Sequence, residues 1–406
     1  MKKPKIRFKG FTGEWETPFV SEVFDIRNGY TPSKNVKEFW EGGTIPWFRM
    51  EDIRENGGIL RDSIQHITPI GVKGNGLFEK NSIILATTAT IGVHAMLIAD
   101  SLANQRFTNF SIRKSLSDKY FSYFVYYAFY RIDEWSKMNT NSGGLLSVNI
   151  PLLLKQPFYT PSIREQKVIT SYFTNLDSLI QSTIKKIDSL KQVKAASLQS
   201  MFPQEGENMP RVRMGKRNDS WKECKLNSIL IERHEVSTIT QDLPQLSFTI
   251  AEGVIRPEDR KSNQRDFLIK DKDNKRYLIT RIGDIIYNPA NVVYGAIHRN
   301  SLMDGVVSPI YRIFSTNQDS RFIECVVRRP SFISQLAMRT EGTVTKLKTL
   351  KPEAFLDMTV SIPTDMEEQR KIGEYFKSLD TQINLQTQRL EKLKQIKSAC
   401  LDNMFV

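Results

Sequence analysis

One long stretch occurs twice in this chain and constrains its fold more than any other feature. SIREQKVITSYFTNLDSLIQSTIKKIDSLKQVKAASLQSMF ends at Phe202, and DMEEQRKIGEYFKSLDTQINLQTQRLEKLKQIKSACLDNMF ends 203 positions later. Neither copy contains proline, and each begins with a capping residue followed three positions later by glutamate, at Ser162…Glu165 and Asp365…Glu368. These features predict two long α-helices, each opened by a capping box.

Apolar residues recur every seven positions along both stretches. A sustained seven-residue repeat predicts a seam against another long helix, as in a coiled coil. Because the chain carries two such seams, we expect its two helices to pair with each other. The predicted seam consists of Ile169, Phe173, Leu176, Ile180, Ile187, Leu190 and Met201 in the first copy and Ile372, Phe376, Leu379, Ile383, Leu390, Leu393 and Met404 in the second.

The duplication also includes the segments before the helices. Trp15 lies 151 positions before Gln166, and Trp221 lies 148 positions before Gln369, so two globular segments of nearly equal length precede the two helices. Short β-branched and aromatic runs between turn-rich strings predict mixed domains of short strands.

Each segment is also expected to hold one shorter helix. The first is predicted at residues 118–138, with a strand at 153–161 leading into the long helix. The second is predicted at residues 320–339, where Pro330 should break or kink it. Residues 203–211 read as a linker between the two halves.

The charge balance restricts the partners. The net charge of +13 argues for a polyanion, with nucleic acid first and an anionic membrane surface second. The three cysteines and four histidines are scattered, which argues against a zinc site and suits a reducing cytoplasm. No apolar run follows the basic N-terminus, and the uncharged run 82–99 reads as two buried strands rather than a membrane span. We therefore expect a cytoplasmic protein.

Three strings suggest enzyme chemistry, but weakly. The glycines of residues 71–76 do not have the spacing of a phosphate-binding loop. Residues 288–291 resemble only part of the Asn-Pro-Pro-aromatic motif of amino-methyltransferases. Glu258 and Asp259, followed by residues 273–275, have nuclease-like spacing but lie in a run of alternating charge that is typical of a solvated loop. We expect no catalytic, cofactor-binding or metal-binding residue.

Polar loop residues make a stronger case for DNA binding. Lys and Arg neutralise phosphates, while Asn, Gln and Arg can bind base edges through two hydrogen bonds. The predicted DNA contacts are Thr31, Ser33, Arg49, Thr88, Thr90, Asn104, Gln105, Arg106, Asn141, Ser142, Gly143, Asn288, Asn291, Arg299, Thr340, Gly342, Thr343, Lys346 and Lys348.

This arrangement resembles the specificity (S) subunit of type I restriction–modification systems. The resemblance is carried by the two helix starts, Pro161…Glu165-Gln166…Tyr172-Phe173…Leu176-Asp177 and Pro363…Glu368-Gln369…Tyr375-Phe376…Leu379-Asp380. Lys191–Lys194 and Lys394–Lys397, the terminal Met-Phe pairs, and the strings Gly29-x-Thr31-Pro32-Ser33 and Ile45-Pro46-Trp47 extend it over essentially the whole chain.

The resemblance implies an α+β fold with a pseudo-two-fold axis, in which two long antiparallel coiled-coil helices separate two duplicated, mixed α/β target-recognition domains. It implies recognition domain 1 at residues 1–158, the central helix at 159–203, recognition domain 2 at 204–361 and the C-terminal helix at 362–406. Each recognition domain would read one half of a split, asymmetric DNA target, and the helices would set the gap between the halves.

The same resemblance implies a non-catalytic subunit. Its expected partners are double-stranded DNA, two methyltransferase (M) subunits docked on the helices and two motor–nuclease (R) subunits, with no membrane. S-adenosylmethionine would bind the M subunits, and ATP and Mg²⁺ would serve the R subunits, which enables adenine methylation or ATP-dependent restriction. Two alternatives stay open: a self-contained DNA nuclease or methyltransferase, and a coiled-coil scaffold without sequence-specific DNA binding.

Overall fold

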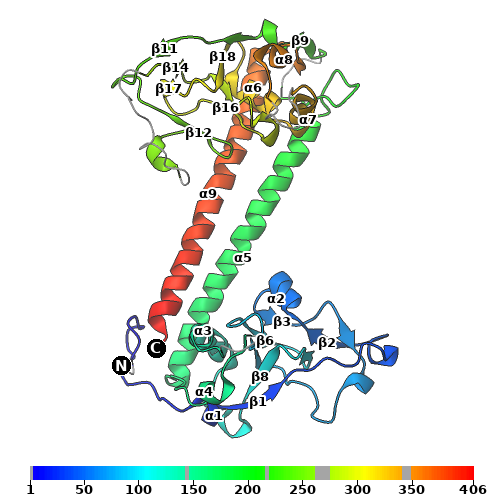
Figure 1. Ribbon diagram of the computed structural model, residues 1–406, viewed down its shortest axis with the longest axis vertical. Coiled ribbons are helices and arrows are strands. Elements are labelled where there is room, and N and C mark those ends of the chain that lie inside the picture. The colour runs from blue at the N-terminus through cyan, green and yellow to red at the C-terminus, as the bar shows by residue number, and fades with distance from the viewer. Residues whose placement is uncertain (1–2, 142–145, 215–218, 261–274, 341–348) are drawn as a thin grey trace. The chain divides into compact units, whose positions relative to one another are not determined.

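Both repeated stretches are helical throughout. In the computed structural model, α5 spans Ile163–Ser200 and α9 spans Met366–Met404, which confirms the two long helices (green and red in Figure 1). The structure describes residues 3–141, 146–214, 219–260, 275–340 and 349–406. The chain forms two units, Met1–Ile184 with Arg389–Val406, and Lys185–Gln388. The start of α5 and the end of α9 therefore belong to the first unit, while the end of α5 and the start of α9 belong to the second.

The helix starts differ from the prediction in one respect. Ser162 Oγ accepts a hydrogen bond from Glu165 N (3.4 Å), and Asp365 Oδ1 accepts one from Glu367 N (2.9 Å). The carboxylates of Glu165 and Glu368 do not close the boxes, because each accepts two hydrogen bonds from an arginine instead. The capped start of each helix is thus confirmed, while the glutamates bind arginines because a charged guanidinium is a stronger donor than a neutral backbone amide.

The first unit contains two sheets. The larger has the order β1 (Phe24–Asn28), β8 (Phe107–Ile112), β5 (Ile83–Ala86), β6 (His94–Leu97) and β3 (Ile59–Leu60), antiparallel except for the β3–β6 pair. The smaller has the order β4 (His66–Ile67), β2 (Ile45–Phe48) and β7 (Leu102–Ala103). Its helices are α1 (Val20–Val23), α2 (Met50–Asn56), α3 (Ser122–Met138) and α4 (Ile150–Leu153).

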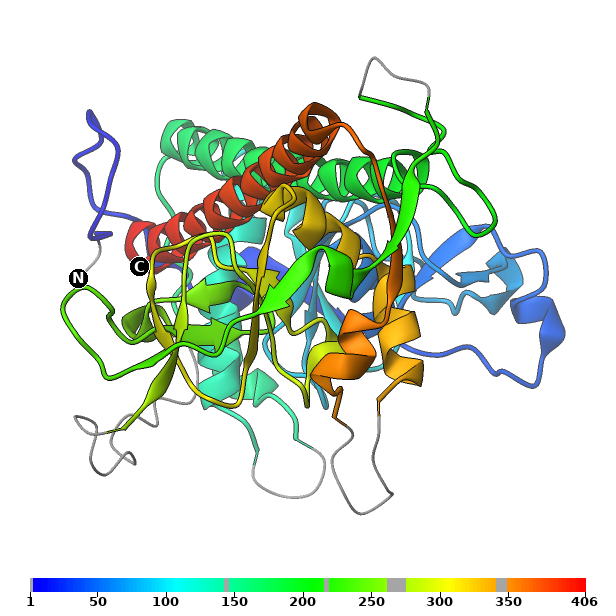
Figure 2. The same ribbon diagram turned by 90° about the horizontal axis from the view of Figure 1, so that it is seen from above.

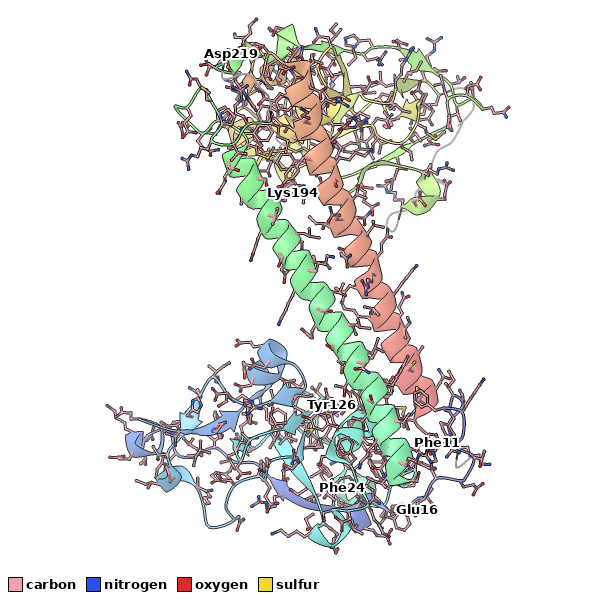
Figure 3. The ribbon with its side chains drawn as sticks, turned by 180° about the vertical axis from the view of Figure 1, so that it is seen from behind. Phe11, Glu16, Phe24, Tyr126, Lys194 and Asp219 are labelled. Atoms are coloured by element: carbon pink, nitrogen blue, oxygen red, sulfur yellow. The ribbon has the colours of Figure 1, made fainter. Side chains whose placement is uncertain are left out.

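The central strand β5 is buried on both faces, which explains its uninterrupted apolar sequence. Ile83 and Leu85 face a core shared with α3 and the long helices, while Ile84 and Ala86 face a second core beneath the smaller sheet. Phe24, labelled in Figure 3, lies in the first core and packs edge-on against Phe110, Phe129 and Phe158. The segment predicted as a strand at 153–161 begins with the end of α4 and then pairs with residues 16–19 through isolated bridges.

The second unit repeats the larger sheet in the same order. Its strands are β10 (Leu230–Glu232), β18 (Arg312–Thr316), β15 (Ile285–Tyr287) and β16 (Ile297–Arg299), all antiparallel. Ile285 pairs with Phe314 as Ile83 pairs with Phe110 in the first unit, so the two sheets also share their register. This repetition confirms the predicted duplication of a mixed α/β domain.

Among the described residues of the second unit, three smaller sheets accompany the larger one. They are formed by β11 (Val236–Ser237), β14 (Tyr277–Thr280) and β17 (Gly305–Val307), by β12 (Ser247–Thr249) with β13 (Gly253–Ile255), and by β9 (Lys222–Lys225) with β19 (Thr359–Ile362). Figure 2 shows β19 in orange, leading directly into α9. The predicted helix 320–339 is divided into α6 (Ser320–Val327) and α7 (Pro330–Met338), as Pro330 required, and α8 (Pro352–Leu356) follows.

Some of the predicted seam residues pack in the cores of the globular parts, and the others pack along the helices. Ile169, Phe173 and Met404 lie in the core of the first unit, and Met201, Ile372, Phe376 and Leu379 lie in the core of the second. Leu176, Ile180 and Ile187 are also buried, while Leu190, Ile383, Leu390 and Leu393 are half-buried. The terminal turns of the heptad pattern thus pack on the globular parts as well as along the helices.

Candidate nucleic-acid interface

One end of the five-stranded sheet carries most of the predicted contact residues of the first unit. Asn28 pairs with Thr108, Ala86 with Phe107 and Leu85 with His94, so β1 and β5 finish where β6 and β8 begin. The turns 29–33, 87–93 and 104–106 therefore lie together. We call these three turns the free end of the first unit.

Backbone hydrogen bonds hold the three turns against one another. Gly29 N donates to Phe107 O (2.8 Å), Tyr30 N to Ala103 O (2.9 Å) and Thr87 N to Arg106 O (2.9 Å). A Cβ on Gly29 would lie 2.3 Å from the carbonyl oxygen of Asn104, so only glycine permits this approach. The free end is thus a preformed surface rather than three independent loops.

Two further segments reach the free end. Val148 N donates to Thr87 O (2.9 Å), and Thr88 forms a bridge with Ser147, which brings residues 139–141 and 146–149 beside the β5–β6 turn. Asn104 N donates to Phe48 O (3.0 Å), which places Arg49 next to the β7–β8 turn. The Arg49 guanidinium lies 5.9 Å from the Trp47 ring centre.

The β7–β8 turn presents the most accessible polar groups at the free end. Gln105 and Arg106 are exposed, and Thr31 Oγ1 donates to Gln105 Oε1 (2.5 Å), which orients the amide. Asn104 Oδ1 accepts from Arg106 N (3.0 Å) and stabilises the turn. Lys73 lies 4.6 Å from the centre of the Tyr30 ring and adds positive charge nearby.

The opposite end of the sheet is attached to the long helix. Gln166 Oε1 accepts from Phe121 N (2.8 Å), and Gln166 Nε2 donates to the carbonyl oxygens of Lys119 (2.8 Å) and Pro161 (3.0 Å). Gln166 is fully buried, so these bonds satisfy its amide. The start of α5 is therefore attached to the segment 119–121 that follows β8, whereas Gln105 and Arg106 at the free end are exposed.

The second unit has the same attachment and the same free end. Gln369 Oε1 accepts from Asp319 N (3.1 Å), while its Nε2 donates to Gln318 Oε1 (2.8 Å) and Pro363 O (2.9 Å). At the other end of the sheet, Tyr287 pairs with both Ile297 and Arg312. We call the turns 288–296 and 308–311 at this end the free end of the second unit.

Two predicted residues shape the free end of the second unit. Asn288 N donates to Ala296 O (2.9 Å), and its Oδ1 accepts from Ala290 N (3.0 Å). Asn291 N donates to Asn288 O (3.1 Å) and continues the same turn. Leu350 N donates to Pro289 O (3.0 Å), as Val148 N does to Thr87 O in the first unit.

The remaining predicted contacts lie in different places. The structure brings Thr31, Arg49, Thr88, Thr90, Asn104, Gln105, Arg106 and Asn141 to the free end of the first unit and Asn288 and Asn291 to that of the second. Ser33 ends the turn 29–33 of the free end, and its carbonyl oxygen accepts from Trp40 Nε1. Thr340 caps α7 by donating to Ala337 O. Ser142, Gly143, Gly342, Thr343, Lys346 and Lys348 lie outside the described residues.

Arg299 is placed away from the other predicted contacts. It pairs with Ile285, at the attached end of the sheet, and its Nε donates to Ser320 Oγ (2.8 Å). Burial lowers the pKa of the Arg299 guanidinium, while nearby Glu324 opposes that shift. This arginine joins strand β16 to helix α6, a role that its sequence context does not reveal.

Sequence reasoning missed the apolar residues at the free end of the second unit. Tyr294 is 72% exposed and Ile310 is 59% exposed, and both lie in turns that flank the central strands. Neither residue is basic, and neither lies in a string of polar residues of the kind that indicated the other contacts. The strand register of the folded chain aligns Ile310 with Arg106.

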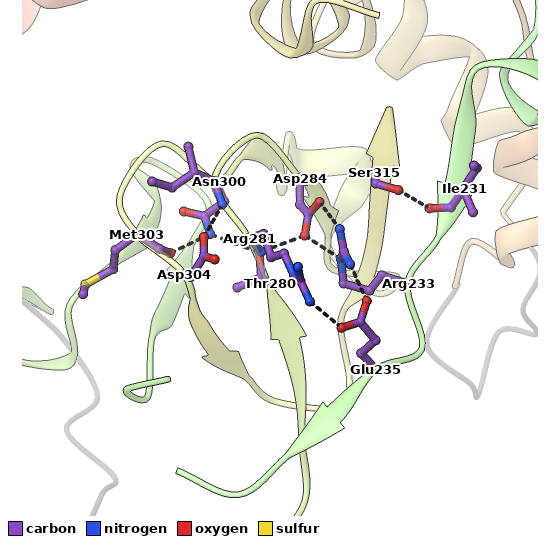
Figure 4. Close-up of polar contacts among 11 residues, drawn as sticks. Ile231, Arg233, Glu235, Thr280, Arg281, Asp284, Asn300, Met303, Asp304 and Ser315 are labelled. Atoms are coloured by element: carbon purple, nitrogen blue, oxygen red, sulfur yellow. Dashed lines mark hydrogen bonds and ion pairs between the residues drawn. The ribbon is translucent and has the colours of Figure 1, made fainter. Parts of the chain in front are cut away.

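An ion network in the second unit, buried at Asp284 and exposed at Glu235 and Arg281, is structural. Arg233 donates from Nε and Nη2 to Asp284 (2.9 and 3.1 Å), and from Nη1 to Glu235, which also accepts from Arg281 (Figure 4). Burial raises the pKa of the Asp284 carboxyl, while Arg233 acts in the opposite direction. Every charge has a partner within the network, which connects β10 to the start of β15 and to β14.

The catalytic alternatives gain no support from the geometry. Within the described ranges, no three His, Cys, Asp or Glu side chains are grouped so that they could hold a metal ion. Glu258 and Asp259 form a short 3₁₀ turn, and residues 273–274 of the nuclease-like pattern lie outside the described residues. Among the described residues, no helix has an apolar stretch of the length that a membrane span requires.

Comparison with known proteins identifies one family. The family model of the type I restriction modification DNA specificity domain matches the chain twice, over residues 12–192 and 218–395. The specificity subunit of the type I restriction enzyme EcoprrI from Escherichia coli is 50% identical over 131 residues, or 32% of this chain and 33% of that protein. That of MjaIX from Methanocaldococcus jannaschii is 27% identical over 202 residues, or 47% and 44%. The matched part is thus less than half the length of either relative.

Longer matches are more distant in sequence. The specificity subunit of MjaVIII from M. jannaschii is 19% identical over 410 residues, which cover 96% of this chain and 91% of that protein. The crystal structure of an S subunit of a type I restriction–modification system from M. genitalium has a TM-score of 0.60 at 13% identity, with 100% and 99% of the two chains covered. This similarity extends the shared fold over the whole chain.

Proposed function

The chain belongs to the family of type I restriction–modification DNA specificity domains, and from this membership we propose that it is the sequence-specificity subunit of such a system. Each unit binds one half of a split DNA target through its free end. The chain itself breaks and forms no bond. Methylation and cleavage are the work of M and R subunits that assemble on it.

One observation carries this proposal: the same backbone surface occurs in both units with different side chains. Gln166 and Gln369 attach equivalent ends of the two sheets to the helices, which leaves equivalent ends accessible. The β7–β8 turn of the first unit carries Gln105 and Arg106, whereas the corresponding turn of the second carries Pro309 and Ile310. A repeated frame with different side chains suits a protein that reads two different half-sites.

The helices serve as the spacer and as the docking surface for M subunits. A helix rises about 1.5 Å per residue, so the 38 residues of α5 and the 39 of α9 each extend about 57 Å. Because the two helices carry the same accessible residues at Tyr172/Tyr375, Lys191/Lys394 and Lys194/Lys397, they offer equivalent docking positions to two identical partners. The assembly of two M subunits and two R subunits with this chain is also part of this proposal.

The decisive experiment is methylome sequencing of cells that express the chain together with its M subunit. We expect one split, asymmetric motif that disappears when this chain is omitted. Replacement of residues 210–361 by the same region of another family member should change one half of the motif and leave the other intact. A change in both halves would contradict independent reading by the two units.

The two alternatives predict different results. A self-contained nuclease or methyltransferase would act on DNA as the purified chain, without M or R subunits. A scaffold without DNA specificity would assemble with its partners but would give no motif that depends on residues 210–361. Neither outcome is compatible with the proposed function.

A further inference from the structure

The β7–β8 turn of the first unit and the β17–β18 turn of the second are structural equivalents. Phe107 N donates to Asn104 O (3.1 Å), and Tyr311 N donates to Ser308 O (3.2 Å), so each is a four-residue β-turn closed by the same bond. Arg106 precedes Phe110 by four residues, and Ile310 precedes Phe314 by four. Both phenylalanines pair with the first residue of the central strand.

The burial of the residues changes in the same order along both turns. In each, the residues before the turn are buried, the first turn residue is half-buried and the next two are exposed. Position for position, Gln105 corresponds to Pro309 and Arg106 to Ile310. The two units therefore present different chemistry from one backbone position.

The chemistry of the second turn is apolar. Gln105 and Arg106 offer an amide and a guanidinium that can bond to base edges, whereas proline has no N–H and isoleucine has no polar side-chain atom. Ile310 is nevertheless 59% exposed. Of the groups that line the major groove of DNA, only the C5 methyl of thymine is suited to such a side chain.

The turn is also held rigidly. Proline at its second position fixes φ in the range that a β-turn requires. Tyr311 packs against the Phe248 ring, with the ring centres 5.1 Å apart, and is half-buried. An isoleucine at the tip of such a turn loses little conformational freedom on contact with a ligand, because its backbone is already ordered.

We propose that Ile310 is a specificity-determining residue that contacts the C5 methyl group of a thymine in the half-site bound by the second unit. This inference depends on the proposed function and goes beyond it, because it names a base and the residue that reads it. It also predicts a difference between the half-sites: the equivalent position in the first unit, Arg106, suits the O6 and N7 acceptors of guanine.

The test uses the complex of this chain with its M subunits and duplexes that contain its methylated motif. Exchange of residues 210–361 first identifies the half-site of the second unit. Each thymine of that half-site is then replaced by uracil, which removes only the methyl group. We expect one replacement to weaken binding about fourfold, which is the loss for one buried methyl group. The Ile310→Ser variant should bind the thymine and uracil duplexes equally.

Ile282→Ser is the matched control. Ile282 is also 59% exposed, but it lies in the turn before β15, at the attached end of the sheet. This variant should keep the full effect of uracil. A half-site without thymine, no thymine sensitive to uracil, or an unchanged effect in Ile310→Ser would each overturn the inference.

The controls separate this inference from the proposed function. If the complex shows no preference for its motif over unrelated duplex, the proposed function fails. If the preference is intact but uracil has no effect in the second half-site, only the assignment of Ile310 fails. Loss of M-subunit binding in Ile310→Ser would show that the residue is a protein contact and would also overturn the assignment.

Discussion

Arg213 donates two hydrogen bonds to the buried carboxylate of Glu368, from Nε (2.9 Å) and from Nη2 (2.5 Å). Arg7 makes the same two bonds to Glu165 in the first unit, both at 2.7 Å. Each arginine also donates to a backbone carbonyl of its own segment, at Asp219 and Gly13. The segment before each domain is thus attached to the start of a long helix by a bidentate ion pair.

This geometry predicts a large cost for Arg213→Met. The Glu368 side chain is inaccessible, so loss of the arginine would leave a buried charge without a partner and destabilise the second unit by about 3–5 kcal/mol. Lys194→Met is the control, because Lys194 and Asp380 are both partly exposed and their ion pair contributes at most about 1 kcal/mol. Urea unfolding of the full chain would measure both. Equal losses of stability in the two variants would contradict the expected difference between the buried and the partly exposed ion pair.

Phe405 should matter more than a residue next to the C-terminus usually does. Its ring lies in the core of the first unit, 5.6 Å from that of Phe173 and 5.7 Å from that of Phe124. Phe405→Ala should therefore cost about 3–5 kcal/mol. Val406→Ala, at a half-buried position, should cost much less. Hydrogen exchange of the α3 amides would measure the loss of stability in both variants. Similar protection in the two variants would contradict the role of the Phe405 ring in the core.

His298 should make the second unit sensitive to acid. Burial, followed by the charge of Arg328, lowers the pKa of its imidazole to about 4, from an ordinary value of 6.5. Between these values the unfolded chain binds a proton that the folded chain excludes. The contribution of neutral His298 to the free energy of unfolding is therefore complete above pH 6.5. It falls as the pH decreases towards 4, by about 3 kcal/mol in all.

His298→Gln tests this effect, since glutamine does not titrate and can still donate to Ile250 O. We expect a flatter dependence of the free energy of unfolding on pH between 6.5 and 4, measured by urea denaturation at a series of pH values. His234→Gln is the control, because His234 lies largely exposed on the surface. An unchanged slope in His298→Gln would show that another group dominates in this range.

DNA binding should depend steeply on salt. With a net charge of +13, the chain should lose most of its affinity between about 50 and 200 mM salt, because each neutralised phosphate releases counterions. Arg106→Ala should weaken binding to the motif and relax selectivity in the first half-site by about 1–3 kcal/mol. Arg113→Ala, at the attached end of the same sheet, should bind normally. Equal losses in the two variants would contradict the assignment of the free end.

Matched deletions in the two helices should shorten the gap in the target. Removal of residues 182–188 together with 385–391 takes one heptad from each helix, including Ile187 and Leu390, and keeps the remaining seam residues in register. Seven residues correspond to about 10 Å of helix, or about three base pairs. Methylome sequencing should therefore find the same half-sites with a shorter gap. An unchanged gap would show that the helices do not set the spacing.

Much of the candidate interface was predictable from local sequence. Gln105, Arg106 and Asn104 form a polar string between two buried strands, and such a string predicts an accessible turn. The roles of Arg299 and of Glu165 and Glu368 were not predictable, because each side chain chooses a partner far away in the chain. Ile310 was missed for a different reason: a single exposed isoleucine has no local signal.

The duplication, the two long helices and the mixed domains between them could all be predicted from the sequence. Periodicity and proline placement act over a few turns of chain, so these features can be read without knowledge of distant contacts. The folded chain was needed to show which segments Gln166 and Gln369 attach to the helices, which arginine binds each buried carboxylate, and which turns are equivalent. Those outcomes depend on contacts between residues remote in sequence, and their strand register and burial exist only in the folded chain.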